Sequence, residues 1–208
     1  SRLDITYPEI AIMQTKALIE AAINVSRKGV KVIPEIMLPL IGDINEFRYV
    51  KTLVINEASK VMKENNYEIK YQIGTMIEIP RACIISSSIA REAQFYSFGT
   101  NDLTQLTYGF SRDDASKFLN DYYEKKIFDF DPFTRIDEKG VGSLVNLALI
   151  DAKRVNPNIE FGICGEHGGE ANSIAFFDRI GLDYVSCSPY RVPIARLAAA
   201  QSKLKNNI

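Results

Sequence analysis

Short apolar runs alternate with longer amphipathic segments along the whole 208-residue chain. The short runs are rich in β-branched residues and are bounded by Gly, Pro or charged residues, which is typical of buried strands. The longer segments place apolar residues three and four positions apart, which predicts helices. The expected strands lie within residues 30–42, 71–80, 93–102, 159–166 and 182–189. The expected helices cover residues 6–28, 44–64, 81–93, 171–181 and 191–205, and a partly helical excursion fills 103–155.

The first helix carries a start signal at its N-terminus. Thr6 is followed three positions later by Glu9, a capping-box pattern, and Pro8 lies in the expected first turn. We therefore expect this helix to begin near residue 6 and to end at Gly29.

Strands that alternate with helices favour βαβ units and a parallel sheet. The expected strands end in polar or Gly-rich residues, and in a (β/α)₈ TIM barrel this carboxyl end is where the chemistry takes place. These residues are Glu35, Glu78, Asn101, Asp102, Cys164, Glu166, Ser186 and Ser188. A closed barrel needs eight strands and typically about 250 residues. We therefore interpret residues 1–208 as a partial barrel domain carrying the last five βα units, with the missing strands or another chain covering the gap.

Composition excludes several other classes of protein. Apolar residues make up 46%, charged residues 25%, and the formal net charge is −1. Since no basic stripe and no apolar run of about 20 residues stand out, we expect neither nucleic-acid nor membrane binding. Three cysteines without metal-ligand spacing favour a reducing compartment, and the C-terminus lacks a Ser-Lys-Leu peroxisomal signal, so we expect a cytoplasmic protein.

Two acidic residues at neighbouring strand ends are candidate metal ligands. Glu78 and Asp102 offer hard carboxylate oxygens, which suit Mg²⁺. Two structural alternatives remain open at this level. Glu78 could instead form an ion pair with Arg81 or Arg112. Asn101 and Asp102 could cap a helix that begins at Leu103.

Other residues of the same segments could bind an anion or move a proton. Gly99 and Thr100 could turn backbone N–H groups toward a phosphate, and Arg112 could bind an anion bidentately. Cys164 lies in the glycine-rich run "GICGEHGG", where a thiol with a tuned pKa could act as an acid or base. We assign Cys83 and Cys187 to packing. The single histidine, His167, is assigned to a structural role or to a role supporting the residues of the site, rather than to a catalytic base. No Ser-His-Asp set can be assembled, which disfavours acyl-transfer hydrolysis.

Four stretches carry a resemblance to a known family. They are "GTMIEIPRA", "SFGTNDLTQLTYGFSRDDASKFL", "GICGEHGG" and "SCSPYRVPIARLAAAQ". They closely resemble the C-terminal phosphoenolpyruvate/pyruvate-binding domain of the pyruvate, phosphate dikinase family, among the phosphoenolpyruvate-utilising enzymes. The resemblance extends over essentially all 208 residues. Phosphoenolpyruvate synthase and sugar-phosphotransferase enzyme I share the Gly-Thr-Asn-Asp-Leu-Thr-Gln type of element but usually lack the Glu-His-Gly-Gly run.

The resemblance implies a role for each candidate residue. Glu78 and Asp102 would coordinate Mg²⁺, which holds pyruvate, and Cys164 would be the general acid that protonates the enolate carbon. The remaining substrate-binding residues would be Gly99, Thr100, Asn101, Arg112 and Arg2, the last matching the arginine of the family's Gly-Cys-Arg-Leu element.

The resemblance also implies what the chain lacks. In this family the phosphocarrier histidine lies in a separate swivelling domain, which His167 does not match, and ATP binds to an ATP-grasp domain. The full enzyme, expected to be a homodimer, interconverts ATP, pyruvate and phosphate with AMP, phosphoenolpyruvate and diphosphate. We expect this chain to be the pyruvate half-site and to be inactive alone. The alternatives are phosphoenolpyruvate synthase, enzyme I, a class II aldolase-type lyase and a non-catalytic dimerisation remnant.

Overall fold

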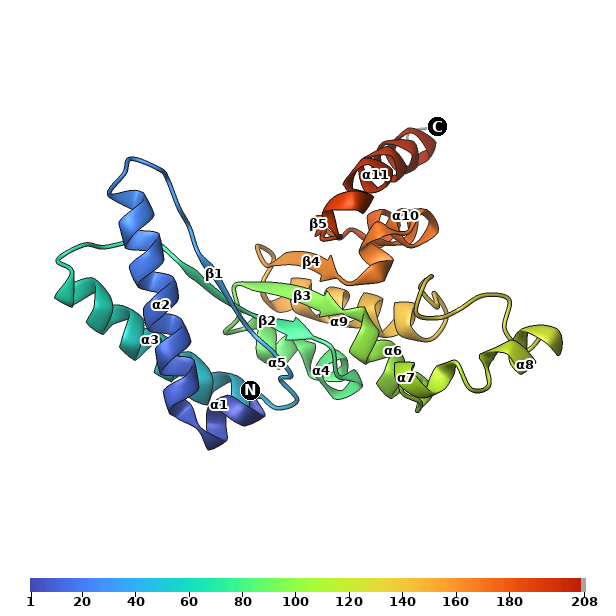
Figure 1. Ribbon diagram of the computed structural model, residues 1–208, viewed down its shortest axis with the longest axis horizontal. Coiled ribbons are helices and arrows are strands. Elements are labelled where there is room, and N and C mark those ends of the chain that lie inside the picture. The colour runs from blue at the N-terminus through green and yellow to red at the C-terminus, as the bar shows by residue number, and fades with distance from the viewer. Residues whose placement is uncertain (207–208) are drawn as a thin grey trace.

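A five-stranded parallel sheet, with strand order β1-β2-β3-β4-β5, organises the molecule (Figure 1). The computed structural model describes residues 1–206. The strands are Glu35–Leu38 (β1), Gln72–Ile77 (β2), Phe95–Gly99 (β3), Glu160–Cys164 (β4) and Tyr184–Val185 (β5). Each lies inside a segment expected to be a strand, and every neighbouring pair is parallel. The predicted α/β organisation with a parallel sheet is therefore confirmed.

Helices connect consecutive strands, as βαβ units require. Figure 1 shows α2 and α3 together at the left end of the molecule, α10 and α11 together at the upper right, and α8 at the far right. The α-helices are α1 (Arg2–Thr6), α2 (Pro8–Ser26), α3 (Ile44–Glu64), α4 (Pro80–Ile84), α5 (Ser86–Ala90), α6 (Thr100–Tyr108), α7 (Arg112–Ala115), α8 (Leu119–Glu124), α9 (Val141–Val155), α10 (Ala171–Ile180) and α11 (Val192–Asn206). Two 3₁₀ turns, η1 (Glu166–Gly169) and η2 (Pro189–Arg191), follow β4 and β5.

The start of the first long helix differs from the prediction. Thr6 ends the short helix α1, and its hydroxyl donates to the Arg2 carbonyl at 3.0 Å. Tyr7 precedes α2, and Pro8 is its first residue, so the capping box expected at Thr6 is wrong. A proline at the first helical position needs no N–H partner, which allows the chain to begin a new helix there.

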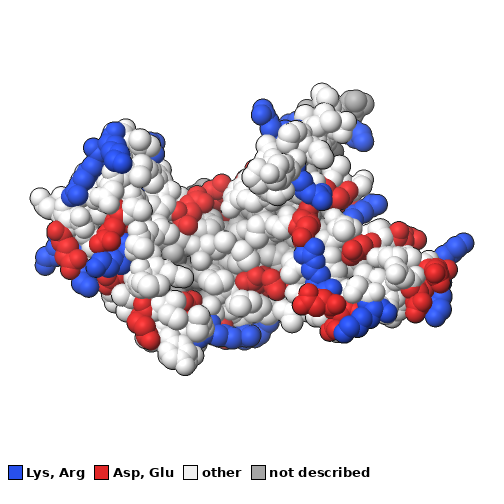
Figure 2. Space-filling model, viewed as in Figure 1, with Lys and Arg blue, Asp and Glu red and all other residues white. Residues whose placement is uncertain are grey.

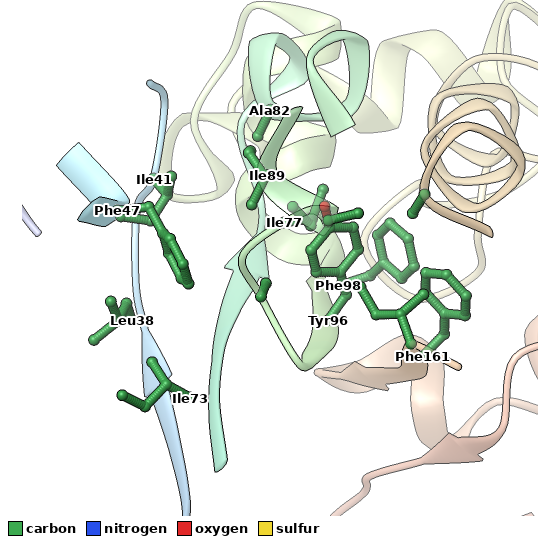
Figure 3. Packing of buried hydrophobic residues seen from close by; sticks show 14 of the residues in the cluster. Leu38, Ile41, Phe47, Ile73, Ile77, Ala82, Ile89, Tyr96, Phe98 and Phe161 are labelled. Carbon is green, nitrogen blue, oxygen red and sulfur yellow. The ribbon is translucent and has the colours of Figure 1, made fainter. Parts of the chain in front are cut away.

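Strand β3 lies at the centre of the core. All five of its residues are buried. The rings of Tyr96 and Phe98 pack against Phe161 of β4, with ring centroids 5.8 and 6.3 Å apart (Figure 3). The Tyr96 hydroxyl donates to the Ser86 carbonyl at 2.7 Å, and the Ser86 hydroxyl donates to the Ala148 carbonyl at 2.7 Å. These buried hydrogen bonds join β3 to α5 and α9, so the two helices hold the strand in position.

The sheet is open within the part of the chain described. In residues 1–206, β1 pairs only with β2, and β5 only with β4. Met37 on β1 and Leu40 just after it are 39% and 36% exposed. An unpaired edge bordered by apolar side chains is costly in water. The sheet therefore has two edges at which further strands could pair.

Within residues 1–206, no helix is both long enough and apolar enough to cross a lipid bilayer.

Gly74 on β2 provides a test of how tightly the sheet is packed. A Cβ at this position would lie 2.4 Å from the Phe95 carbonyl oxygen, whereas one at Gly42 would meet atoms only at 3.6 Å. We expect Gly74→Ala to destabilise the protein by about 1–3 kcal/mol, because backbone must move. We expect Gly42→Ala to change stability by less than about 0.5 kcal/mol. Thermal unfolding of the two variants measures the difference, and equal midpoints would contradict this packing.

Candidate active site

The carboxyl ends of β2, β3 and β4 bring the candidate residues to one edge of the sheet. Ile77 pairs with Phe98, and Gly99 pairs with Cys164, so the three strands end at nearly the same level. Glu78 follows β2 directly, and Asp102 lies in the first turn of α6, directly after β3. The predicted convergence of these side chains at one edge is thus present in the structure.

Glu78 is a buried carboxylate. The residue is only 4% exposed, and its Oε1 atom accepts a hydrogen bond from the Leu40 N–H at 2.7 Å. Burial raises the pKa of Glu78 above its ordinary value, and the negative charge of Asp102 raises it further. The Leu40 hydrogen bond opposes both effects. The charge of Asp102 thus disfavours ionisation of the neighbouring Glu78 carboxylate.

Neither arginine considered as a partner of Glu78 pairs with it. Arg81 forms its ion pair with Asp43 at 3.2 Å, and Arg112 pairs with Glu166. The ion-pair alternative for Glu78 is therefore wrong. The described residues contain no group of three or more His, Cys, Asp or Glu placed to hold a metal, so Glu78 and Asp102 stand as a pair.

Gly99 permits the close approach of Glu78 to β3. A Cβ at residue 99 would lie 2.7 Å from the Glu78 Cβ, 2.8 Å from Glu78 Oε2 and 2.8 Å from the sulfur of Met76. Real Cβ atoms do not approach other atoms so closely, so any other residue would displace the carboxylate. The absence of a side chain at Gly99 leaves the room that the Glu78 side chain occupies.

Helix α6 begins at Thr100, three residues before Leu103, where the capping alternative placed the start of this helix. Gly99 is its N-cap and offers no side-chain cap. The capping role considered for Asn101 and Asp102 is therefore wrong, because both already lie in the first turn. Asp102 Oδ1 instead accepts from the Gln105 side-chain amide at 3.3 Å.

Arg112 joins the loops that follow β3 and β4. Its guanidinium donates to both oxygens of Glu166, at 2.9 and 2.7 Å, and to Asn101 Oδ1 at 3.3 Å. The Gln105 side-chain oxygen accepts the Arg112 backbone N–H at 2.8 Å. The pair is partly exposed, so it contributes little to stability, yet its bidentate geometry fixes the direction of Arg112. Hydrogen bonding to Arg112 also lowers the pKa of Glu166.

Glu166 and Gln105 are the site residues whose contacts the sequence did not reveal. Gln105 lies three positions after Asp102, a spacing that brings helical side chains together. Glu166 is noted among the strand-end residues, but nothing in the sequence pairs it with an arginine 54 positions earlier.

Cys164 ends β4 as a half-buried thiol. Its sulfur lies 3.7 Å from the Phe98 carbonyl oxygen, to which the thiol donates. Burial raises the pKa of Cys164, a hydrogen bond with Ser97 lowers it, and the charges of Glu78 and Asp102 raise it again. At neutral pH the thiol therefore carries its proton. Cys164 therefore lies near enough to both carboxylates for their charges to act on its thiol.

The other cysteines lie away from this cluster. Cys83 is fully buried, and burial raises its pKa to about 12. Cys187 packs against a small apolar group that includes Ala195 and Ala198. A packing role agrees with the position of Cys83, whereas Cys187 is partly exposed and also lines the pocket beside β5.

His167 is buried between two hydrogen-bond partners. Nδ1 lies 2.7 Å from Thr100 Oγ1, and Nε2 lies 2.9 Å from the Pro132 carbonyl oxygen. Burial lowers the pKa of His167. Thr100 is itself fully buried, so its hydroxyl faces His167. The structural role expected for His167 agrees with this geometry.

Arg2 is not brought into the cluster by any contact. It is exposed at the start of α1, and within residues 1–206 its guanidinium has no hydrogen bond or ion pair. The neighbouring Ser1 hydroxyl donates to the Leu40 carbonyl at 2.8 Å, on the loop that also binds Glu78. Arg2 thus directly follows, along the chain, the residue that contacts this loop.

A pocket of about 470 Å³ opens beside the carboxyl ends of β4 and β5. Its lining includes Gly165, Glu166, Ser186 and Arg191. On the face shown in Figure 2, acidic and basic side chains are interspersed, without a continuous basic surface. Cys187 and Ser188 complete the lining, so the pocket is bordered by polar residues of mixed charge and does not include Cys164.

The pKa of Cys164 gives a measurable consequence of the carboxylate pair. We expect iodoacetamide to label Cys164 slowly at neutral pH and faster as the pH rises above the ordinary thiol range, because burial and two negative charges disfavour the thiolate. Asp102→Asn removes one charge and shifts the labelling midpoint to lower pH. Mass spectrometry of the Cys164 peptide, with chelator present, measures both midpoints. Cys83 serves as the internal unlabelled control, and a Cys164 midpoint unmoved by Asp102→Asn would contradict the proximity of these groups.

Comparison with known proteins identifies close relatives. Residues 1–204 match the family described as PEP-utilising enzyme, PEP-binding domain. The chain is 56% identical over 206 residues to pyruvate, phosphate dikinase of Clostridium symbiosum, covering 99% of this chain and 24% of that protein. It is 55% identical over 200 residues to the chloroplastic pyruvate, phosphate dikinase of Flaveria bidentis, covering 96% and 21%. The chain thus spans about a quarter or less of these relatives' length.

A solved structure shares the fold at low sequence identity. A citrate lyase from Burkholderia xenovorans LB400 superposes with a TM-score of 0.53 and 13% identity, covering 81% of this chain and 49% of that one. This similarity concerns the fold alone.

Proposed function

The chain belongs to the PEP-utilising enzyme family as its PEP-binding domain, and from this premise we propose that it is the pyruvate half-site of a pyruvate, phosphate dikinase. The reaction proposed for this half-site is phosphoryl transfer between a phosphohistidine and pyruvate through an enolate. The observation that carries the proposal is the convergence of Glu78, Asp102 and Cys164 at one edge of the sheet. In the full enzyme, ATP, pyruvate and phosphate would be interconverted with AMP, phosphoenolpyruvate and diphosphate.

Glu78 and Asp102 fit a Mg²⁺ site. Both side chains offer oxygen ligands, and Glu78 is buried. The negative charge of Asp102 raises the pKa of Glu78, and a bound cation would oppose this effect. Two protein carboxylates suffice, because Mg²⁺ usually keeps other positions for water and substrate. When bound, the metal ion would act as a Lewis acid toward the carbonyl oxygen of pyruvate.

The start of α6 and Arg112 provide for the anionic parts of the substrate. The N-terminus of α6 lacks a side-chain cap, so backbone N–H groups near Gly99, Thr100 and Asn101 are available to a carboxylate or phosphoryl oxygen. Arg112 lies beside Asn101, held by Glu166, where its guanidinium can face a phosphoryl group. We also propose that Arg2 approaches the substrate from α1, across the loop at Leu40.

Cys164 supplies the proton. Its raised pKa keeps the thiol protonated, and the thiol lies in the same field as the two carboxylates. In the direction of pyruvate formation, the thiol protonates the methylene carbon of the enolate. In the reverse direction the thiolate removes that proton.

The open sheet supports a larger closed structure. Five parallel strands in sequential order, with both edges unpaired in residues 1–206, are what five-eighths of a (β/α)₈ barrel would present. We propose that residues 1–208 are the C-terminal part of such a barrel domain. Because the relatives are far longer, we further propose phosphohistidine and ATP-grasp domains in the same cytoplasmic, homodimeric enzyme.

Exchange of the pyruvate methyl protons with D₂O tests the proposal. In the full-length enzyme, with Mg²⁺ and a phosphorylated carrier, we expect exchange visible by NMR. Cys164→Ala lowers its rate by about 100-fold or more, since general acid–base catalysis contributes this much. Cys83→Ala, which alters a buried thiol outside the pocket lining, is the matched control and should exchange normally. Exchange that survives Cys164→Ala would assign the proton to another group, and no exchange in the loaded unmutated enzyme would contradict the enolate mechanism.

A further inference from the structure

His167 connects three segments that border the site. It lies in η1, directly after Glu166, and its two ring nitrogens contact Thr100 of α6 and Pro132 of the excursion between α8 and α9. The residue is 1% exposed. A buried imidazole with both nitrogens in contact has a defined hydrogen-bond role at each one.

The tautomer follows from the partners. The Pro132 carbonyl can only accept, so Nε2 of His167 must carry a proton. Burial lowers the pKa of His167 and so favours the neutral imidazole, in which Nδ1 has no proton and accepts. The Thr100 hydroxyl therefore donates to Nδ1, at 2.7 Å. Its only hydroxyl proton is used within the protein, so Thr100 can donate to the substrate from its backbone N–H but not from its hydroxyl.

Both ends of this connection adjoin residues of the proposed site. Thr100 is the first residue of α6 and directly precedes Asn101 and Asp102. On the other side, Pro132 precedes Phe133, whose ring lies 5.9 Å from the Arg112 guanidinium. A shift of His167 would therefore move the first turn of α6 relative to Arg112.

We propose that His167 is a positioning residue that holds Thr100, and through it the metal- and substrate-facing turn of α6, by accepting the Thr100 hydroxyl proton at Nδ1. This inference rests on the proposed function of that turn. The bond to Thr100 serves the reaction, and the bond to Pro132 anchors the imidazole.

Two substitutions of His167 separate the two hydrogen bonds. Asparagine places a carboxamide oxygen near the position of Nδ1 and can still accept from Thr100. Glutamine reaches the position of Nε2 and can donate to Pro132, but offers Thr100 no acceptor at Nδ1. In the full-length enzyme we expect His167→Gln to lower kcat/KM for pyruvate methyl exchange by about 10- to 100-fold, as small misplacements do. We expect His167→Asn to recover most of this loss.

A double mutant tests whether the effect passes through Thr100. Thr100→Val removes the hydroxyl with little change of shape and should lower kcat/KM as His167→Gln does. The double variant should fall no lower than either single variant, because both remove the same interaction. Additive losses would overturn the proposal, and so would His167→Asn being the more damaging single variant. Equal kcat/KM in both His167 variants, with only the unfolding midpoint lowered, would show a purely structural role and overturn it as well.

Asp102→Asn distinguishes this inference from the proposed function. If Asp102→Asn abolishes exchange while His167→Gln and His167→Asn behave alike, only the positioning role fails. If Asp102→Asn leaves exchange intact, the proposed function itself fails.

Discussion

The candidate site depends on a buried carboxylate packed directly against a glycine. Glu78 packs against Gly99 so closely that any side chain at position 99 would overlap it. One hydrogen bond from the Leu40 N–H also holds the carboxylate. A buried carboxylate beside a second one is costly unless a cation or a proton compensates it. The geometry of β2 and β3 thus creates a local excess of negative charge at the edge of the sheet. Burial is the main cause of the raised pKa values of Glu78 and Cys164, and the neighbouring negative charge raises both further.

A network of hydrogen bonds extends from this pair to the loops around it. Arg112 is held by Glu166, Asn101 and Gln105, and Thr100 is held by His167. These contacts cross between the loops after β3 and β4, whose strands rest on the buried rings of Phe98 and Phe161. Rigid strands therefore support the site, while the partly exposed Arg112–Glu166 pair fixes the direction of the guanidinium at its border.

Local patterns in the sequence predict the elements but not their contacts. Each of the five short runs contains one strand, and residues 44–64 form one helix, because these signals depend on neighbouring residues alone. The first helix divides at Tyr7, and the helix expected at 81–93 divides at Ile85. The Thr100–His167 and Arg112–Glu166 bonds join residues 67 and 54 positions apart, and no short motif encodes such pairings. What the parallel sheet did allow was the prediction that Glu78, Asp102 and Cys164 would lie at one edge.

Metal binding tests the central claim most directly. Mn²⁺ can replace Mg²⁺ as an oxygen-ligated probe, and its electron paramagnetic resonance spectrum separates bound from free ion. In the full-length enzyme with pyruvate, Glu78→Gln and Asp102→Asn should each weaken Mn²⁺ binding by more than about tenfold. Glu138→Gln, which alters a surface carboxylate paired with Arg179, should bind Mn²⁺ as the unmutated enzyme does. Binding that is equally tight in Glu78→Gln and Asp102→Asn would contradict the account.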